Sequence, residues 1–483
     1  MDDEREIVRL IDTSQEQFVF WAALSYVWGG DQILKTTVSS TTERNEQMAI
    51  SEFPQTLQDA FTVCKAIGIQ HLWVDCLCIV QDDEEDLARE LEAMPKIYQN
   101  AWVTISASTA DNVSRGFLED RGYATDFYGG IVSLPYISTD GNSSGSIVLC
   151  GGLVPNGHDD TAPIHQRAWT YQERRMSPRV LDFNKATLSF ICRTGRFRRG
   201  HSSELWTLRK ADVSSSTWAG QERVLPCTGN HELPNWHAIV GDYATRKLTF
   251  PNDKLRAIAA LAELYSIRTK QTYVAGLWME TLIVGLCWYL RDDPGGSGLA
   301  PRPREYRAPS WSWAAIDVEA TRPLQFLTNL EFDSVFGRQG DSASGDRGLN
   351  PEAMLVHLIL EQTPPNTTYG RIQSASLTLE GLALNTKWSF DEGYQILQDI
   401  YMFTTRDAKE DMVPTTKGEW PVTAFVLVRG TEGIQMLEIF VFGLLLVEEA
   451  SEQYRRVGTF RIWLRPARHD INKIFQRRHI TII

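Results

Sequence analysis

The segment WTYQE carries the residues whose types and spacing are best suited to chemistry. Trp169 and Glu173 are four residues apart, so on a helix the indole ring and the carboxylate share one face. Arg167, Arg174 and Arg175 are near enough in sequence to pair with Glu173 instead. The carboxylate is therefore either a functional group or a member of a solvated ion pair, which usually contributes little to stability.

A second group of candidates ends the first apolar run, FVFWAALSYVW over residues 18–28. Such a run is typical of a strand buried on both faces. Ser25, Tyr26, Trp28 and Gly29 would then lie at the carboxyl end of the strand, where open α/β sheets bind ligands. The glycine pair that starts at Gly29 lets a backbone approach closely. Neither a GxGxxG nor a GxxxxGK[ST] pattern is present, and Trp28 suits plain packing equally well.

A third candidate is Asp75, within the apolar run HLWVDCLCIV. Because an ionised carboxylate inside an apolar strand is costly unless it is paired, we expect a structural contact with Arg167 or with a backbone amide rather than catalysis. Cys76 and Cys78 would point to opposite faces of this strand and could not share a metal ion. We assign no metal site.

The elements that must position these residues alternate between strand and helix. A helix is predicted within 54–68 from its apolar stripe. Asp82 and Glu85 have the spacing of a capping box and open a second helix, which Pro95 should kink or shorten. A third strand is predicted over 102–107. Strands alternating with helices across short connections predict parallel β-α-β units.

The rest of the chain predicts three regions. Residues 122–160 read as an inserted loop or hairpin, followed by the helix QRAWTYQERR and by two strands on either side of Asn184. We therefore predict an α/β domain over 8–195. A mainly helical region over 196–300 follows from the stripes in DKLRAIAALAELY and AGLWMETLIVGLCWYL. A β-rich region over 301–483 follows from short β-like runs that include WSWAAI and TAFVLVRG.

Composition excludes several classes of function. The 483 residues carry a net charge of -13, which repels nucleic acid. The one basic cluster, RTGRFRRGH over 193–201, could meet a phosphate or an acidic partner, although a solvated loop is the default expectation. Seven cysteines without a CxxC pair indicate a reducing compartment. The acidic N-terminus does not resemble a signal peptide, and no apolar stretch is long enough to span a bilayer. We expect a cytoplasmic protein with no nucleic-acid partner and no membrane span.

Three blocks, ALSYVWGGDQ (23–32), LWVDCLCIVQDD (72–83) and RAWTYQERRMSPRVLDF (167–183), resemble the heterokaryon-incompatibility (HET) domain of filamentous fungi in their order and spacing. The similarity continues downstream, for example in APSWSWAAID. The chain departs from the family pattern at Phe53, where a leucine is usual, and at Pro95, which falls inside the helix that follows the second block.

The resemblance implies a cytoplasmic role in self/non-self discrimination, in which activated HET domains trigger cell death after unlike hyphae fuse. HET domains are also remotely similar to Toll/interleukin-receptor (TIR) domains, which have a flavodoxin-like sheet and some of which cleave NAD. The implied fold is thus a flavodoxin/TIR-like parallel sheet, followed by a helical segment and a β-rich region.

In the NAD-cleaving relatives a helix carrying Trp and Glu follows a core strand, and WTYQE is the segment most similar to it. By this resemblance Glu173 is the catalytic carboxylate, which would hold the ribose hydroxyls and stabilise an oxocarbenium charge. The residues implied to bind NAD as substrate are Ser25, Tyr26, Trp28, Gly29, Asp75, Arg167 and Trp169. No resident cofactor is assigned.

Three hypotheses follow for the function. The first is an effector of incompatibility that triggers cell death through its HET domain. The second is an NAD or nucleotide glycohydrolase that works through Glu173, which is compatible with the first. The third is a non-catalytic scaffold that works as a homo-oligomer. We expect a protein partner in incompatibility signalling, and the sequence does not identify it.

Overall fold

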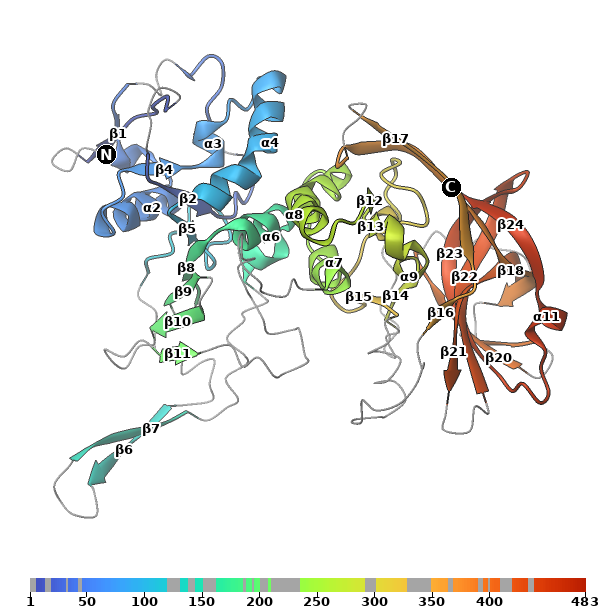
Figure 1. Ribbon diagram of the computed structural model, residues 1–483. Helices are drawn as coiled ribbons and strands as arrows, with labels where there is room; N and C mark the ends of the chain where they lie inside the picture. The colour runs from blue at the N-terminus through green and yellow to red at the C-terminus, as the bar shows by residue number, and fades with distance from the viewer. Residues whose placement is uncertain are drawn as a thin grey trace. The chain divides into compact units, whose positions relative to one another are not determined.

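The computed structural model divides the chain into two compact units, Met1–Leu233 and Pro234–Ile483, drawn in Figure 1. The finer division of the chain at residues 195 and 300 stays a prediction. The structure describes residues 6–13, 19–31, 34–41, 46–119, 131–137, 144–150, 162–185, 188–192, 195–199, 207–209, 235–291, 301–327, 349–363, 368–389, 394–397, 400–408, 419–432 and 438–483.

The first unit is built on a seven-stranded sheet in the order β11-β10-β9-β8-β5-β2-β4. Its strands are β2 (Trp21–Ser25), β4 (His71–Trp73), β5 (Val103–Ser106), β8 (Arg179–Phe183), β9 (Leu188–Cys192), β10 (Gly195–Arg199) and β11 (Thr207–Arg209). The first four of these strands are parallel. Their spatial order, second-first-third-fourth, is the flavodoxin-like order, and it reverses between β2 and β5.

The sheet is mixed rather than wholly parallel, which corrects the prediction. Strands β9, β10 and β11 continue the sheet beyond β8 in antiparallel pairs. Short connections join these strands, and a short connection between neighbouring strands permits only antiparallel pairing. The α/β class of this unit is confirmed, whereas the likeness to TIR domains stays a prediction.

The helices of the first unit match most of the sequence pattern. They are α2 (Gln55–Ala66), α3 (Asp75–Cys78), α4 (Glu84–Asn100) and α6 (Ala168–Met176), with the short helices η1 (Ile50–Glu52) and η2 (Pro163–Gln166). Asp83 rather than Asp82 caps α4, because its side chain accepts hydrogen bonds from the backbone N–H groups of Glu85 and Asp86. The helix continues past Pro95, so this proline does not end it.

The strand predicted through Asp75 is wrong. β4 ends at Trp73, and Asp75 is the first residue of α3. Cys76 and Cys78 therefore lie on one helical turn, not on alternate faces of a strand.

The remaining described elements of this unit are two small antiparallel pairs. One joins β1 (Ile7–Val8) to β3 (Met48–Ala49), and the other joins β6 (Ile131–Ile137) to β7 (Ser144–Cys150). The second pair confirms the hairpin alternative for the insertion. The predicted basic loop over 193–201 lies partly outside the described residues, and its central part is strand β10.

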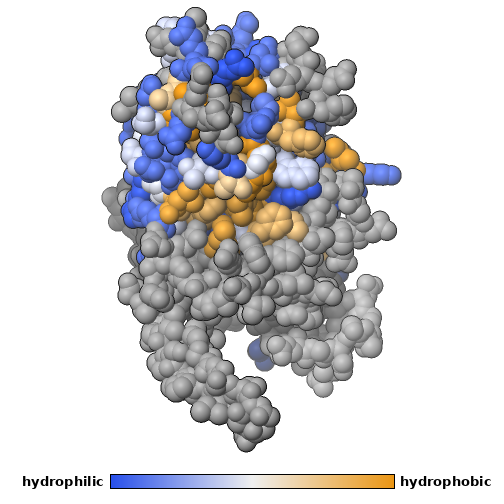
Figure 2. Space-filling view, turned by 90° about the vertical axis from the view of Figure 1, so that its left-hand side faces the viewer, coloured by the Kyte–Doolittle hydropathy of each residue, from blue (hydrophilic) through white to orange (hydrophobic). Residues whose placement is uncertain are grey.

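The core of the first unit joins β2, β5 and α2 through residues such as Leu24, Ile105 and Ala60. Its surface also exposes hydrophobic side chains, including the neighbouring rings of Phe20 and Trp102. Figure 2 shows hydrophobic residues gathered on the side of the molecule that it displays. Among the helices that the structure describes, none has the length and apolar composition needed to cross a membrane.

The second unit begins with short helices and hairpins. Its helices are α7 (Trp236–Ala244), η4 (Pro251–Asp253), η5 (Arg256–Ile258), α8 (Ala259–Thr269), η6 (Met279–Thr281), α9 (Leu282–Gly285), η7 (Trp313–Ala315) and α11 (Ile471–Ile474). The short strands beside them are β12 (Tyr273–Val274), β13 (Leu277–Trp278), β14 (Trp288–Leu290) and β15 (Leu324–Phe326). The strand expected at WSWAAI is wrong, because this segment holds η7.

The long helix expected over 275–290 is also wrong. Ala275 and Gly276 both have positive φ, of 48° and 92°, and they form the two-residue turn between β12 and β13. Positive φ at both central residues is the signature of a type I′ hairpin turn. The turn breaks the chain into strands where the apolar stripe alone predicts a helix.

The β-rich region is confirmed as one nine-stranded sheet. Its strands are β16 (Asn350–Pro351), β17 (Met354–Thr363), β18 (Arg371–Ser389), β19 (Tyr394–Leu397), β20 (Ile400–Arg406), β21 (Glu419–Glu432), β22 (Glu438–Ala450), β23 (Gln453–Leu464) and β24 (Gln476–Ile482). Pairing runs from β18 through β21, β22, β23 and β24 and back to β18. The strands thus close into a ring whose core includes Val426, Leu445 and Phe460.

Candidate functional site

Glu173 lies inside the first unit, against the end of the first parallel strand. Ser25, the last residue of β2, donates a hydrogen bond from Oγ to Glu173 Oε2 over 2.5 Å. Helix α6, which carries Glu173, lies between β5 and β8 in the chain and contacts both β2 and α4. Only 7% of Glu173 is exposed. The reading of Glu173 as a solvated surface residue is therefore wrong.

The surroundings of Glu173 bring its protonation equilibrium close to neutral pH. Burial raises the pKa of Glu173 to about 7, against the opposing effects of the Ser25 hydrogen bond and the positive charge of Arg167. Tyr98 of α4 lies beside the same site, where its hydroxyl donates to the carbonyl oxygen of Leu24 over 2.9 Å. At neutral pH both the neutral and the charged form of the carboxyl are populated.

Arg167 connects the start of α6 to the segment that follows β2. It is the residue that precedes the first helical residue of α6, and its guanidinium donates to the carbonyl oxygen of Tyr26 over 2.7 Å. The Tyr26 side chain is buried. Burial and the nearby carboxylate of Asp75 raise the pKa of its hydroxyl well above the ordinary value. The hydrogen bond from Arg167 to the Tyr26 carbonyl oxygen holds a positive charge at the carboxyl end of the sheet.

Asp75 is held by two hydrogen bonds, one to each carboxylate oxygen. Trp28 Nε1 donates to Asp75 Oδ2 over 2.9 Å, and the backbone N–H of Cys76 donates to Asp75 Oδ1 over 2.7 Å. The predicted contact with a backbone amide is thus confirmed. Burial raises the pKa of Asp75, while the charge of Arg167 and the Trp28 hydrogen bond lower it. Trp28 has a polar role besides packing.

Gly29 is required by the geometry of its own chain. Its φ is +72°, and a Cβ atom at this position would lie 2.1 Å from Cβ of Asn112. A side chain would therefore be strained in conformation and would collide with the neighbouring loop. The predicted close approach at Gly29 is therefore confirmed, and the neighbouring atoms belong to Asp111 and Asn112 of the same unit.

Trp169 is half-buried on α6, one turn before Glu173. Within the described residues no hydrogen bond joins it to the other candidates. Of the eight candidates, six are joined in pairs by hydrogen bonds, namely Ser25 with Glu173, Trp28 with Asp75, and Tyr26 with Arg167. The three sequence blocks therefore meet at one end of the parallel sheet.

The sequence reasoning missed a row of polar side chains beside Glu173. Ser25, Ser106 and Asp182 are in register on the adjacent strands β2, β5 and β8, so their side chains lie on one face of the sheet. All three are buried. Asp182 offered one signal, as the only acidic residue of the strand RVLDF, but the register that aligns the row cannot be read from separate segments.

Asp182 anchors the far end of this polar row. Ser108 Oγ donates to Asp182 Oδ1 over 2.5 Å, and Arg174 of α6 forms an ion pair with Asp182 Oδ2 over 3.2 Å. The consecutive residues Glu173 and Arg174 thus contact the two ends of one row. The arrangement provides a carboxyl able to exchange a proton near neutral pH, with hydroxyl groups at its side and a guanidinium close by. Among the described residues no group of three or more His, Cys, Asp or Glu is placed to hold a metal ion.

Comparison with known families places this site within one matched region. Residues 21–173 match the family described as heterokaryon incompatibility protein (HET), which confirms the resemblance drawn from the three blocks. The matched region begins in β2, ends at Glu173 and contains all eight candidate residues. No curated protein and no solved structure matches the chain.

Proposed function

We propose that this chain, which carries a HET domain over residues 21–173, is an effector of heterokaryon incompatibility whose first unit triggers cell death by cleaving NAD or a related nucleotide. The observation that carries the enzymatic part is the hydrogen bond between Ser25 and the buried Glu173. This hydrogen bond lies at the end of β2, where the order of the parallel strands reverses between β2 and β5. Ligands of open α/β sheets bind at such a position.

The chemistry assigned to the site is hydrolysis of the N-glycosidic bond. The bond between ribose C1′ and the nicotinamide nitrogen breaks, and its electron pair leaves with nicotinamide, which becomes neutral. Water adds to C1′ and releases one proton. The ionised Glu173 would hold the ribose hydroxyls and stabilise the positive charge that develops on the sugar. The positive charge of Arg167 at the same edge suits the phosphates of a dinucleotide.

Substrate binding would exchange one hydroxyl group for another. Glu173 accepts a hydrogen bond from the Ser25 hydroxyl, so a ribose hydroxyl can replace Ser25 without leaving the carboxylate unsatisfied. Because only the ionised carboxylate stabilises a cation, turnover should rise with pH through the pKa of Glu173, about 7.

Cell death on expression in a filamentous fungus tests the proposal. Glu173→Gln keeps the size of the side chain and removes its charge. Asp59→Asn is the matched control, because Asp59 is also 7% exposed in the same unit, and it accepts hydrogen bonds from the backbone of Phe117 and Leu118. We expect killing by the wild type and by Asp59→Asn, and loss of killing by Glu173→Gln at equal protein levels.

Unchanged killing by a folded Glu173→Gln variant would overturn the enzymatic part and favour a non-catalytic scaffold. Absence of killing by the wild type at any level of expression would instead overturn the effector role. A thermal melt of each purified variant separates loss of function from loss of fold.

A further inference from the structure

Strand β17 of the second unit is hydrogen-bonded along one edge. It pairs antiparallel with β18, and in the described part of the chain no strand pairs along its other edge. Figure 1 shows β17 at the margin of its sheet. An unpaired edge offers a row of backbone N–H and C=O groups to another strand.

The side chains of β17 do not protect this edge. The strand MLVHLILEQT contains no lysine and no proline, the residues that commonly block edge-to-edge pairing. Met354, Leu355, Val356 and Ile359 are exposed hydrophobic residues. Such exposure on an edge strand marks a surface that another strand is expected to cover.

The regular part of β17 is short and well defined. Its pairing with β18 has register shifts between Leu355 and His357 and between Glu361 and Gln362. Bulges of this kind discourage pairing, so the stretch from His357 to Glu361 is the part best able to accept a second strand. This stretch contains one imidazole, that of His357, and one carboxylate, that of Glu361.

This stretch is complementary to itself. In an antiparallel pair of two copies centred on Ile359, His357 of each copy lies directly opposite Glu361 of the other. Ile359 faces Ile359, and Leu358 faces Leu360. His357, Ile359 and Glu361 share the exposed face of the strand, since alternate residues of a strand point to the same side. Opposite partners on one face of a sheet stabilise the pairing.

One oxygen of the Glu361 carboxylate is bound within its own sheet. Its Oε2 accepts a hydrogen bond from Ser374 Oγ of β18 over 2.7 Å, which holds the carboxylate over the β17–β18 hairpin. Oε1 is then the oxygen that the imidazole of the opposite His357 would reach.

We propose that β17 is a self-association strand, through which two copies of this chain pair antiparallel about Ile359. The contact is isologous, because the same residues face each other across a twofold axis. This inference goes beyond the proposed function of the first unit and does not depend on it. Pairing with a strand of a different protein would be the competing arrangement.

Charge reversal on the full chain tests the register. His357→Glu makes both charged positions acidic, whereas His357→Lys combined with Glu361→Lys makes both basic. Each variant alone sets like charges opposite each other, and we expect its dimer to weaken by about tenfold or more. Mixing the two variants places opposite charges at both 357–361 contacts and should restore the dimer. Sedimentation gives the masses, and Lys473→Glu, an exposed charge change on α11, should behave as wild type.

A cysteine at the twofold axis supplies a second measurement. Under oxidation, Ile359→Cys should form a disulfide between two copies, since opposite Cβ atoms of paired strands are about 5 Å apart. Val356→Cys is the matched control, because it is equally exposed, at 52% against 47% for Ile359. Its two copies would be about 20 Å apart in this register. The wild type in the same oxidant gives the baseline.

The two measurements give clear outcomes. Restoration of the dimer on mixing, with a cross-link at position 359 and none at 356, supports the proposal. A wild type that stays monomeric at tens of micromolar overturns it. A dimer that survives in both charge variants, or equal cross-linking at both positions, also overturns it. If Ile359→Cys chains stay monomeric and instead cross-link to an added protein, the occupant of the edge is not a second copy.

Discussion

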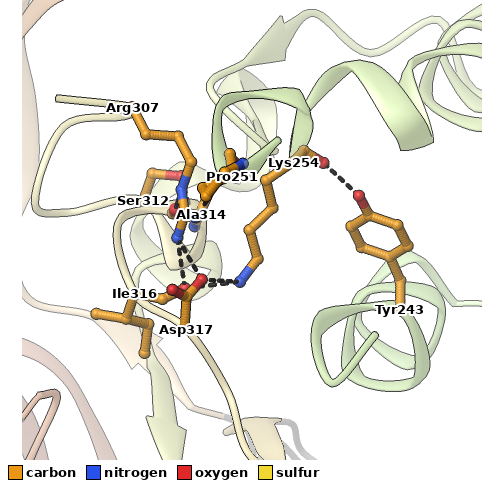
Figure 3. A network of polar contacts seen from close by, with 8 residues as sticks. All are labelled: Tyr243, Pro251, Lys254, Arg307, Ser312, Ala314, Ile316 and Asp317. Carbon is orange, nitrogen blue, oxygen red and sulfur yellow. Dashed lines mark hydrogen bonds and ion pairs between the residues drawn. The ribbon is translucent and has the colours of Figure 1, made fainter. Parts of the chain in front are cut away.

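Two buried ionisable groups, one in each unit, have a pKa shifted to about 7 from opposite directions. Burial raises the pKa of Glu173 in the first unit. Burial and the charge of Arg307 lower the pKa of Lys254 in the second unit. Figure 3 shows Lys254 and Arg307 directed at Asp317, with Tyr243 bound to the Lys254 backbone. The two groups differ in what holds them, and this difference separates a candidate site from a structural network.

Lys254 and Arg307 hold the backbone at η7, and Arg307 also holds the first residue of η4. Lys254 Nζ donates to the carbonyl oxygen of Ile316 over 2.7 Å. Arg307 donates to the carbonyl oxygens of Pro251, Ala314 and Ile316 and to Asp317. Backbone acceptors within the same unit fix both cations in place, as is typical of a structural network.

Glu173, by contrast, accepts a hydrogen bond from the side-chain hydroxyl of Ser25, which a ribose hydroxyl would replace under the proposed function. It lies at the carboxyl end of a strand, where a ligand is expected. The shifted pKa is common to both groups and does not distinguish them. The type of hydrogen-bond partner and the position in the fold distinguish Glu173 from Lys254.

Removal of Arg307 should have the largest effect on stability. Arg307→Ala removes the guanidinium donor from the carbonyl oxygens of Pro251 and Ala314, and it leaves Ile316 and Asp317 with Lys254 alone. We expect a loss of about 3–5 kcal/mol in the free energy of unfolding. Urea unfolding of the full chain measures it, with the exposed Arg291→Ala as control. A loss below about 1 kcal/mol would show that this network is not structural.

Lys254 should make stability increase at alkaline pH. The folded lysine loses its proton near pH 7, whereas the unfolded lysine keeps it to about pH 10.5, so the unfolded state binds more protons between these values. The wild type should gain up to about 4 kcal/mol across this window relative to Lys254→Met. Urea unfolding at pH 7, 8.5 and 10 measures the difference, and parallel curves for the two proteins would refute it.

Ionisation of Glu173 should make the protein less stable as the pH rises, which is the opposite of the effect of Lys254. Its folded pKa, about 7, lies above the unfolded value of 4.5, so the folded state binds more protons between these values. Wild-type stability should therefore fall as pH rises from 4.5 to 7, by up to about 3 kcal/mol relative to Glu173→Gln. The variant should be the more stable protein at pH 8, and the two should be similar near pH 4.5. A pH-independent difference would contradict the buried state of this carboxyl.

Loss of the Ser25 hydroxyl should have the smallest effect. Ser25→Ala removes the hydrogen bond to Glu173 Oε2, and a single hydrogen bond of this kind contributes about 1 kcal/mol. Because this bond lowers the pKa of Glu173, the pH at which turnover rises should shift upward. An unchanged profile would indicate that Ser25 does not contact the ionised carboxylate. Ser189→Ala, at a buried serine on β9, is the control.

Local patterns in the sequence predicted the elements of the site well. The apolar run before Gly29, the stripe of α2 and the helix ended by Ser177 are each encoded within about 15 residues. The Glu173 helix and its neighbouring strands follow from such signals. The resemblance to HET domains rests on the same segments.

Features that depend on distant pairing could not be predicted. The register of Ser25, Ser106 and Asp182 depends on which strands become neighbours. The partner of Asp75 also depends on distant packing, because its carboxylate accepts the indole N–H of Trp28, which lies 47 residues away in the sequence. Sequence reasoning found Asp75 but placed it in a strand, whereas it is the first residue of α3.

Release of nicotinamide from NAD by the purified chain is the most direct test of the role assigned to Glu173. Chromatography at pH 8 would follow the product for the wild type, Glu173→Gln and Asp59→Asn. We expect release by the wild type and the control, and a rate lower by about two orders of magnitude or more for Glu173→Gln. No release by the wild type, or equal rates for wild type and Glu173→Gln, would contradict it.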